Sequence, residues 1–135
     1  MAKEDIKIIT NDTTMAIKKG NLYLGVLDNK VAEYREILDF RKENGEGLLQ
    51  WILDMNISGD PLLKNRVNEE VKHQATLQIR PCANTLQKYM FQDEYAYLHT
   101  QIAGMFKDVL LEYLNEQKHA YLAVENKYQT NEVLA

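Results

Sequence analysis

The sequence contains few of the residues that cross-link a chain, break its helices or anchor it in a membrane. Cys82 is the only cysteine, so no disulfide can form within the chain, which fits a reducing compartment. No segment approaches the ~20 consecutive apolar residues that cross a bilayer, and the opening Met-Ala-Lys-Glu-Asp lacks the apolar run of a signal peptide. We therefore expect a cytoplasmic protein, or one inside a particle assembled in the cytoplasm, without membrane contact.

Proline and glycine are also scarce, with two and six residues in a chain of 135. Such a chain is not expected to be largely disordered. Its hydrophobic fraction of 45% and charged fraction of 27% are ordinary for a globular protein of one domain with its own core. The net charge of −4 argues against a broad nucleic-acid surface, because such surfaces neutralise phosphates with Lys and Arg. A local basic patch could still bind a nucleic acid.

Catalytic residue sets are missing as well. Ser58 is the only serine and lies in a predicted turn, and Cys82 has no histidine near it in the sequence. The one closely spaced glycine pair, Gly45 and Gly47, lacks both the spacing and the lysine of a phosphate-binding loop. These absences predict a protein that is not an enzyme and needs no cofactor.

The first part of the chain has the period-two alternation of apolar residues that is typical of β-strands. The apolar residues in this part are Ile6, Ile8, Ile9, Met15, Ile17, Leu22, Leu24 and Val26. Gly20 and Asn21 can supply the positive φ of a tight turn between strands. We expect a β-hairpin or a short three-stranded meander over residues 1–28. It must pack on the helices or on a neighbouring subunit, because so few strands are barely stable alone.

Helical signals dominate residues 29–135. The first helix is expected to begin after an N-cap at Asp28 or Asn29 and to end near Asn44. The short helix predicted over residues 46–57 is apolar almost all round, so we expect it to be central or to cover an interface.

The segment from Ser58 to Pro61 is the clearest boundary between helices. Gly59 ends one helix, Asp60 caps the next, and Pro61 takes its first position. The helix that follows carries an apolar stripe at four-residue spacing, formed by Leu63, Val67, Val71, Ala75 and Ile79. Pro81 is expected to end or kink this helix, because the residue before a proline avoids the α conformation.

The C-terminal third of the chain is one long helical pattern. Residues 84–128 contain no proline and only one glycine, Gly104. One helical face is formed by Leu98, Ile102, Met105, Val109 and Tyr113. We expect either a break near residues 92–94 or Asn115, or one long helix that packs against neighbouring subunits. The whole sequence predicts an α+β fold, predominantly α, with four to five helices in a bundle and a single domain overall.

Tyrosines are concentrated in the second half of the chain, where six of the eight lie between residues 89 and 128. Tyrosine suits surfaces that become buried against a partner, although partial burial at the edge of a monomer core would explain the same pattern. The aromatic residues that we expect in an interaction surface are Trp51, Tyr95, Tyr97, Tyr113 and Tyr121.

These features favour a non-enzymatic structural or protein-interaction module. It would assemble with itself as a homo-oligomer, or with other proteins of a larger complex. Small proteins of this build occur among phage connector and packaging components, which is an analogy of class and not a resemblance.

A DNA-binding regulator is the first alternative. The two helices and the turn predicted over residues 47–79 have about the lengths found in a helix-turn-helix motif. The second helix would be the recognition helix that contacts the DNA bases. The basic residues of that helix are Lys64, Arg66 and Lys72. Glu69 and Glu70 lie among them and would repel phosphates, so we favour this hypothesis less than assembly.

A metal-binding helical bundle is the second alternative. The spacing Glu-x-x-His occurs twice, in Glu70 with His73 and in Glu116 with His119. Ferritin-like bundles build a di-iron site from two such pairs and a glutamate from each of two other helices, and Glu36 and Glu94 stand in the matching order. The helix geometry argues against a site in which all the ligands point inward. His73 lies about 200° around its helix from Val71, which belongs to the apolar stripe.

Overall fold

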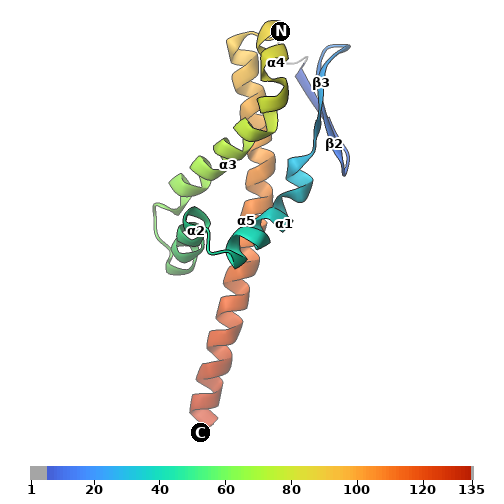
Figure 1. The fold of residues 1–135 in the computed structure, drawn as a ribbon. Helices are drawn as coiled ribbons and strands as arrows, with labels where there is room; N and C mark the ends of the chain where they lie inside the picture. The colour runs from blue at the N-terminus through green and yellow to red at the C-terminus, as the bar shows by residue number, and fades with distance from the viewer. Residues whose placement is uncertain (1–5, 135) are drawn as a thin grey trace.

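The chain folds into a small antiparallel sheet followed by helices. A computed structural model describes the backbone of residues 6–134 and the side chains of residues 6–124. It is 72% helical, so the fold is α+β and mostly α, as predicted. The elements are β1 (Ile6–Thr10), β2 (Thr14–Lys19), β3 (Leu22–Asp28), α1 (Lys30–Glu43), α2 (Gly47–Ser58), α3 (Leu63–Ile79), the 3-10 helix η2 (Arg80–Cys82), α4 (Ala83–Tyr89) and α5 (Gln92–Leu134) (Figure 1). Among the described residues, no helix is both long enough and apolar enough to span a membrane.

The three strands form an antiparallel meander in the order β1-β2-β3. The Asn11 side chain accepts hydrogen bonds from the N–H groups of Thr13 and Thr14, which fixes the first turn. Gly20, with a φ of 60°, lies in the second turn. Four strand residues belong to the same buried cluster as the helices, namely Ile6, Met15, Ile17 and Leu24. The sheet and the helices therefore share one core.

Two helix ends lie where the sequence places them. Asn29 caps α1, since its side chain accepts a hydrogen bond from the Ala32 N–H at 3.2 Å. Gly59 ends α2 in the left-handed conformation, with a φ of 72°, which side chains other than glycine rarely adopt.

The start of α3 differs from the prediction. Asp60 is not the N-cap, which is Leu62, without a side-chain cap; instead the Asp60 carboxylate accepts a hydrogen bond from the Leu62 N–H at 2.8 Å in a turn before the helix. The Asp60 backbone carbonyl also accepts from the Leu63 N–H at 3.1 Å. Pro61 and Leu62 are held in a turn by these two bonds, so the helix begins at Leu63, two residues later than expected.

Two breaks separate α3 from α5. The chain tightens into η2 at Pro81, as predicted, and α4 follows. Helix α5 begins close to the break expected near residues 92–94, where Glu94 accepts a hydrogen bond from the Phe91 N–H at 2.7 Å. It continues without a break at Asn115 and has 43 residues, which is about 64 Å at the rise of an α-helix.

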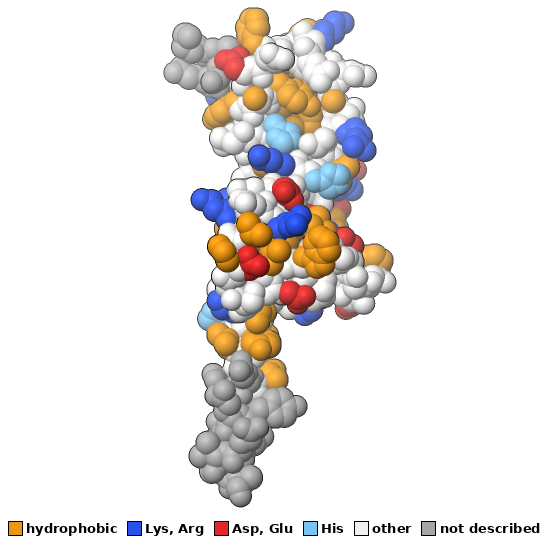
Figure 2. Space-filling model, turned by 90° about the vertical axis from the view of Figure 1, so that its left-hand side faces the viewer, with side chains coloured by type: hydrophobic (Ala, Val, Ile, Leu, Met, Phe, Trp, Pro, Cys, Tyr) orange, Lys and Arg blue, Asp and Glu red, His pale blue; other side chains and the backbone are white. Residues whose placement is uncertain are grey.

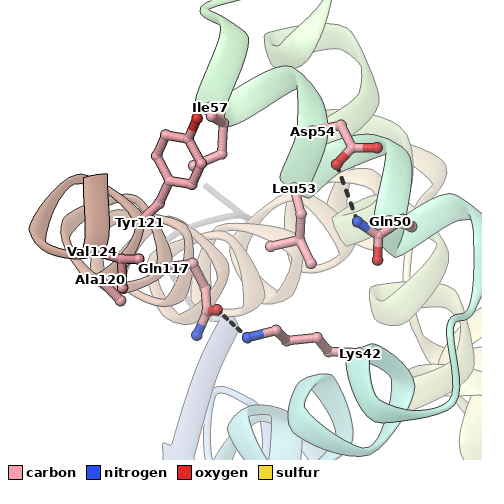
Figure 3. A pocket seen from close by; sticks show the side chains of 9 residues that line it. All are labelled: Lys42, Gln50, Leu53, Asp54, Ile57, Gln117, Ala120, Tyr121 and Val124. Carbon is pink, nitrogen blue, oxygen red and sulfur yellow. Dashed lines mark hydrogen bonds between the residues drawn. The ribbon is translucent and has the colours of Figure 1, made fainter. Parts of the chain in front are cut away.

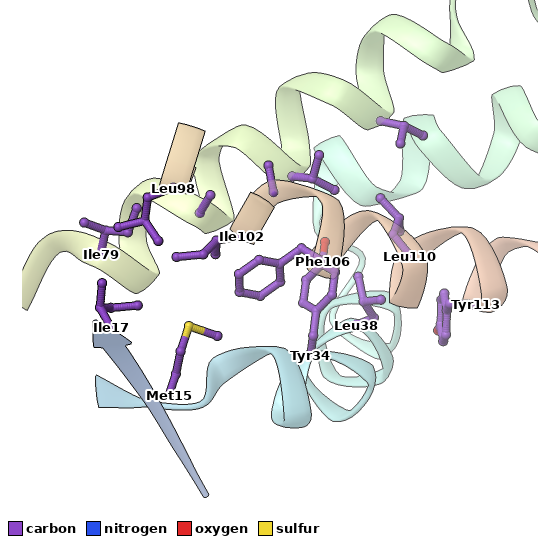
Figure 4. Close-up of a cluster of buried hydrophobic side chains, with 14 of the residues drawn as sticks. Met15, Ile17, Tyr34, Leu38, Ile79, Leu98, Ile102, Phe106, Leu110 and Tyr113 are labelled. Atoms are coloured by element: carbon purple, nitrogen blue, oxygen red, sulfur yellow. The ribbon is translucent and has the colours of Figure 1, made fainter. Parts of the chain in front are cut away.

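The core lies along one face of α5 (Figure 4). The buried residues on this face are Leu98, Ile102, Phe106, Leu110, Tyr113 and Leu114. Met105 and Val109, which belong to the predicted face, are only half-buried, because the stripe that meets the other elements passes through Phe106 and Leu110. Phe106 packs edge-on against Tyr34 of α1, with ring centroids 5.0 Å apart.

A buried ion pair ties α1 to α3 beside this core. Arg41 donates to both carboxylate oxygens of Glu70 at 2.9 and 3.0 Å, and the Tyr34 hydroxyl donates to the same carboxylate at 2.7 Å. Burial and the Glu70 charge raise the pKa of Tyr34, so the hydroxyl keeps its proton. Arg41 also donates to Glu46 just before α2. One guanidinium group therefore connects three helices.

We expect loss of this guanidinium group to destabilise the fold strongly. In Arg41→Met, the Glu70 carboxylate is left 1% exposed and without its cation, so the free energy of unfolding should fall by about 3–5 kcal/mol. The matched control is Arg35→Met, which removes an exposed pair with Glu116 and should lower the free energy of unfolding far less than Arg41→Met. Urea unfolding followed by Trp51 fluorescence measures both. Similar losses in the two variants would contradict the role given to Arg41.

A second ion pair makes stability depend on pH. Burial acts to raise the pKa of Glu94, but the Phe91 N–H and the Lys19 ammonium, 2.9 Å away, lower it overall. A carboxylate whose pKa is lowered by folding stabilises the protein above its unfolded pKa, here about 4.5, and loses this contribution as the pH falls through the folded pKa.

The free energy of unfolding should therefore drop less between about pH 7 and about pH 3 in Glu94→Gln than in the wild type. Urea titrations at both pH values check this. Asp12→Asn, an equivalent change at an exposed turn position, is the matched control. An unchanged slope in Glu94→Gln would show that Glu94 does not titrate as inferred.

Candidate interaction surface

A hollow opens between α2 and the part of α5 that leaves the body of the protein (Figure 3). Its volume is about 380 Å³. Leu53 and Ile57 line the α2 side. On the α5 side, the Tyr121 ring points toward Ile57, and Ala120 and Val124 lie along the same helix. The floor of the hollow is therefore mainly apolar.

Helix α2 is held by α1 at its start and by α5 near its end. At its start, burial acts to raise the pKa of Glu46, but Arg41 and two backbone N–H groups of α2 lower it overall, so the capping carboxylate stays ionised. Near its other end, the Asn56 side chain donates to the Leu114 carbonyl at 2.9 Å. This contact brings the last turn of α2 against α5 and sets the width of the hollow.

Polar side chains surround the apolar floor. Lys42 of α1 donates to Gln117 of α5, and Gln50 donates to Asp54 at 3.1 Å within α2. Asp54 makes no ion pair with any described residue, and neither does Lys118, which follows Gln117 on α5. The hollow and its border thus carry one carboxylate, Asp54, and two amines, Lys42 and Lys118, that form no ion pair with a described residue.

Beyond the hollow, α5 exposes apolar side chains. Tyr121, Leu122 and Val124 are 49%, 44% and 56% exposed, whereas Leu114, two turns earlier, is 2% exposed. Figure 1 shows the lower part of α5 extending past the other helices, and Figure 2 shows hydrophobic side chains on this narrow part. The apolar face of α5 therefore continues past the point where other described elements cover it.

Three of the five predicted interaction residues are at the surface. Tyr121 lines the hollow. Trp51 is 57% exposed on α2, and its ring lies 5.4 Å from the Arg66 guanidinium, in cation–π geometry. Tyr97 is exposed near the start of α5, where it lines a smaller hollow beside β1. The three lie on separate parts of the molecule and do not form one patch.

The other two predicted interaction residues are less accessible. Tyr95 is half-buried against the core. Tyr113 corrects the prediction: it is fully buried, because the inward face of α5 passes through it, so a partner cannot reach it in this fold. Burial raises the pKa of Tyr113 to about 12, and the Asp39 carboxylate lies nearby without the geometry of a hydrogen bond. The side chain of Tyr128 lies outside the described residues.

The structure does not bring the four candidate metal ligands together. Glu70 is buried on the inner side of α3 and forms an ion pair with Arg41, whereas His73 is exposed on the outer side. Glu116 pairs with Arg35, and His119 is exposed. Within residues 6–124, no three His, Cys, Asp or Glu side chains lie close enough to hold a metal ion.

The residues of the nucleic-acid hypothesis lie along the outside of α3. Lys64 and Lys72 are exposed. Arg66 is engaged on two sides, by the Trp51 ring and by the Glu69 carboxylate at 3.4 Å. No geometric feature of the α2–α3 pair favours base recognition over an ordinary helical hairpin.

Comparison with known proteins identifies no relative, because no family model, curated protein or solved structure matches the chain. Sequence reasoning also missed most of the hollow, including Leu53, Ile57 and Val124. The available signal was the apolar character of the α2 sequence on all sides, which indicates an interface but not its partner. Chemically, the hollow can bury an apolar helix or side chain and pair charges of both signs.

Proposed function

We propose that the protein is a non-enzymatic assembly module that forms a homodimer through the hollow and the adjoining part of α5. The observation that carries this proposal is the continuation of the α5 core face past the body, from Leu114 at 2% exposure to Tyr121 and Val124 at about half exposure. Exposed apolar surface that continues a buried face is typical of a surface that another molecule covers.

The projecting part of α5 gains little stability from its own chain. A helix in water is marginal without tertiary packing, because helix formation has a costly nucleus and propagation alone gains little. Here Tyr121, Leu122 and Val124 would stabilise the helix only if they were buried. A partner that covers them would supply the missing packing.

A second copy of the chain fits this surface because the surface is self-complementary. Each molecule offers both a hollow lined by Leu53 and Ile57 and a projecting helix with apolar side chains to fill it. In a two-fold contact each copy contributes both parts once, which closes the assembly at a dimer. The unpaired Asp54 of one copy would then approach the unpaired Lys118 of the other.

The nucleophilic side chains of the chain support a role without catalysis. The Ser58 hydroxyl donates to the Met55 carbonyl at 3.3 Å at the end of α2, as helix-terminal serines do. Burial raises the pKa of the Cys82 thiol, which is the opposite of the shift that activates a nucleophile.

Native mass measurement tests the dimer directly. At about 100 μM the protein should have twice the monomer mass of 15.7 kDa by light scattering after size exclusion. Tyr121→Asp with Val124→Asp should weaken the dimer at least about tenfold, because both charges would be buried in the contact. Ala96→Asp, on the exposed face near the other end of α5, should leave the mass unchanged. A wild-type monomer at this concentration would overturn the proposal.

Charge reversal tests which surfaces meet. Asp54→Lys and Lys118→Asp should each weaken the dimer about three- to tenfold, because each places two like charges opposite one another. The double variant should recover most of the affinity, since the pair is restored with its signs exchanged. Analytical ultracentrifugation measures the four dissociation constants. If the double variant is as weak as the sum of the single effects, the two residues do not meet across a dimer.

A further inference from the structure

A second hollow lies on a different part of the molecule, between α3 and α5. It has a volume of about 340 Å³, within the range of small-molecule sites. Asn68, Val71 and Lys72 line it on α3, and Thr100, Ala103 and Gly104 on α5. Figure 2 shows the side of the molecule that carries α3, where Lys, Arg and His side chains gather at mid-height of the body.

Two hydrogen bonds between the helices close the ends of this hollow. At one end, Thr76 Oγ1 and His99 Nε2 are 2.9 Å apart. At the other end, Lys107 Nζ donates to Asn68 Oδ1 at 3.2 Å. Because residues 99 and 107 on α5 are eight positions apart, the hollow is about 12 Å long. A partner helix would have to break both bonds, whereas a small ligand fits between them.

Gly104 opens the floor of the hollow without a structural need for glycine. Its φ is not positive, and a Cβ added to it would meet no atom within 4 Å. Glycine lowers the stability of a helix interior relative to alanine, so neither the backbone nor the packing explains it. A ligand that lies against the α5 backbone at this position would explain it.

The charges at the hollow are all of one sign. The Lys72 ammonium makes no hydrogen bond or ion pair with a described residue, and the Lys107 ammonium is held only by the neutral Asn68. No carboxylate is among the residues that line the hollow, although the chain as a whole has a net charge of −4. Val71, Ala103 and Gly104 supply an apolar surface in the same hollow as the two amines.

We propose that this hollow binds a small organic anion with an apolar body, such as a medium-chain carboxylate. The acid group lies between Lys72 and Lys107, and the apolar body lies on Val71, Ala103 and Gly104. Amines attract the carboxylate by charge-assisted hydrogen bonds, and the apolar floor buries the chain. The site is separate from the proposed dimer contact and does not depend on it.

Titration of the ¹⁵N-labelled full chain with octanoate tests the site. The amide signals of Gly104, Ala103 and Lys72 should shift in a saturable way, with a dissociation constant on the order of 0.1–1 mM. The neutral 1-octanol should bind more weakly, and inorganic phosphate should bind more weakly because it lacks the apolar body. No saturable shift with octanoate, or equal binding of octanol or phosphate, would overturn the assignment.

Variants separate the site from general effects on folding. Gly104→Leu fills the hollow and should abolish the octanoate shifts while its melting temperature stays at or above the wild-type value, because leucine is a better helix former than glycine. Lys72→Gln and Lys107→Gln should each weaken octanoate binding about two- to fivefold and leave octanol binding unchanged.

The matched controls are Ala96→Leu, on α5 outside the hollow, and Lys88→Gln, on α4, and both should bind octanoate like the wild type. Unchanged octanoate binding in Gly104→Leu would overturn the proposal. A changed native mass in Gly104→Leu would assign the hollow to a contact between copies of the chain instead, which also overturns it.

Discussion

The apolar face of α5 is the constraint on which the rest of the structure depends. Helices α1, α2, α3 and α4 all pack against α5. Yet α1, α2 and α3 have 14, 12 and 17 residues, whereas α5 has 43. Since α3 and α4 cover its first part and α1 and α2 its middle, no described helix remains to cover its last part (Figure 1). The exposed end of α5, with Tyr121 and Val124, thus follows from the difference in helix lengths. It leaves an apolar surface that a partner could cover.

The charge network around Arg41 determines how the shorter helices sit on that face. Apolar packing alone tolerates small rotations of a helix, because it is not directional. The bonds from Arg41 to Glu70 and Glu46 are directional, and they connect α1 to the middle of α3 and to the start of α2. Since Glu46 also caps α2, the same group fixes the direction in which α2 points at Leu114. The hollow beside Tyr121 therefore depends on a buried ion pair that does not line it.

Local signals were sufficient to predict most of the fold, and long-range pairing was not. Asn29, Gly59 and Pro81 act on their own neighbours, so their effects on helix ends follow from the sequence. Glu70 shows the opposite case, because its spacing from His73 suggested a metal site, while its actual partner, Arg41, lies 29 residues away. Tyr113 was assigned to a surface because tyrosine suits both surfaces and cores, and only the course of α5 decides between them. The hollow beside α2 forms where three helices meet. The apolar periodicity of a single helix does not predict such a contact.

The two hollows use α5 in different ways, and this difference separates their roles. At the α3–α5 hollow, other elements cover α5 on one side, and Gly104 carries no side chain on the other side. The missing side chain leaves a bounded space beside the helix. At the α2–α5 hollow, α5 carries large apolar side chains and projects beyond its neighbours, so the space is open to another helix. Gly104 and Tyr121 lie 17 positions apart, which is about 25 Å along the helix axis. At that distance a ligand at the first surface and a partner at the second share no lining residue, and α5 connects them directly, beside the contacts of α3 with α2 and the Arg41 bonds.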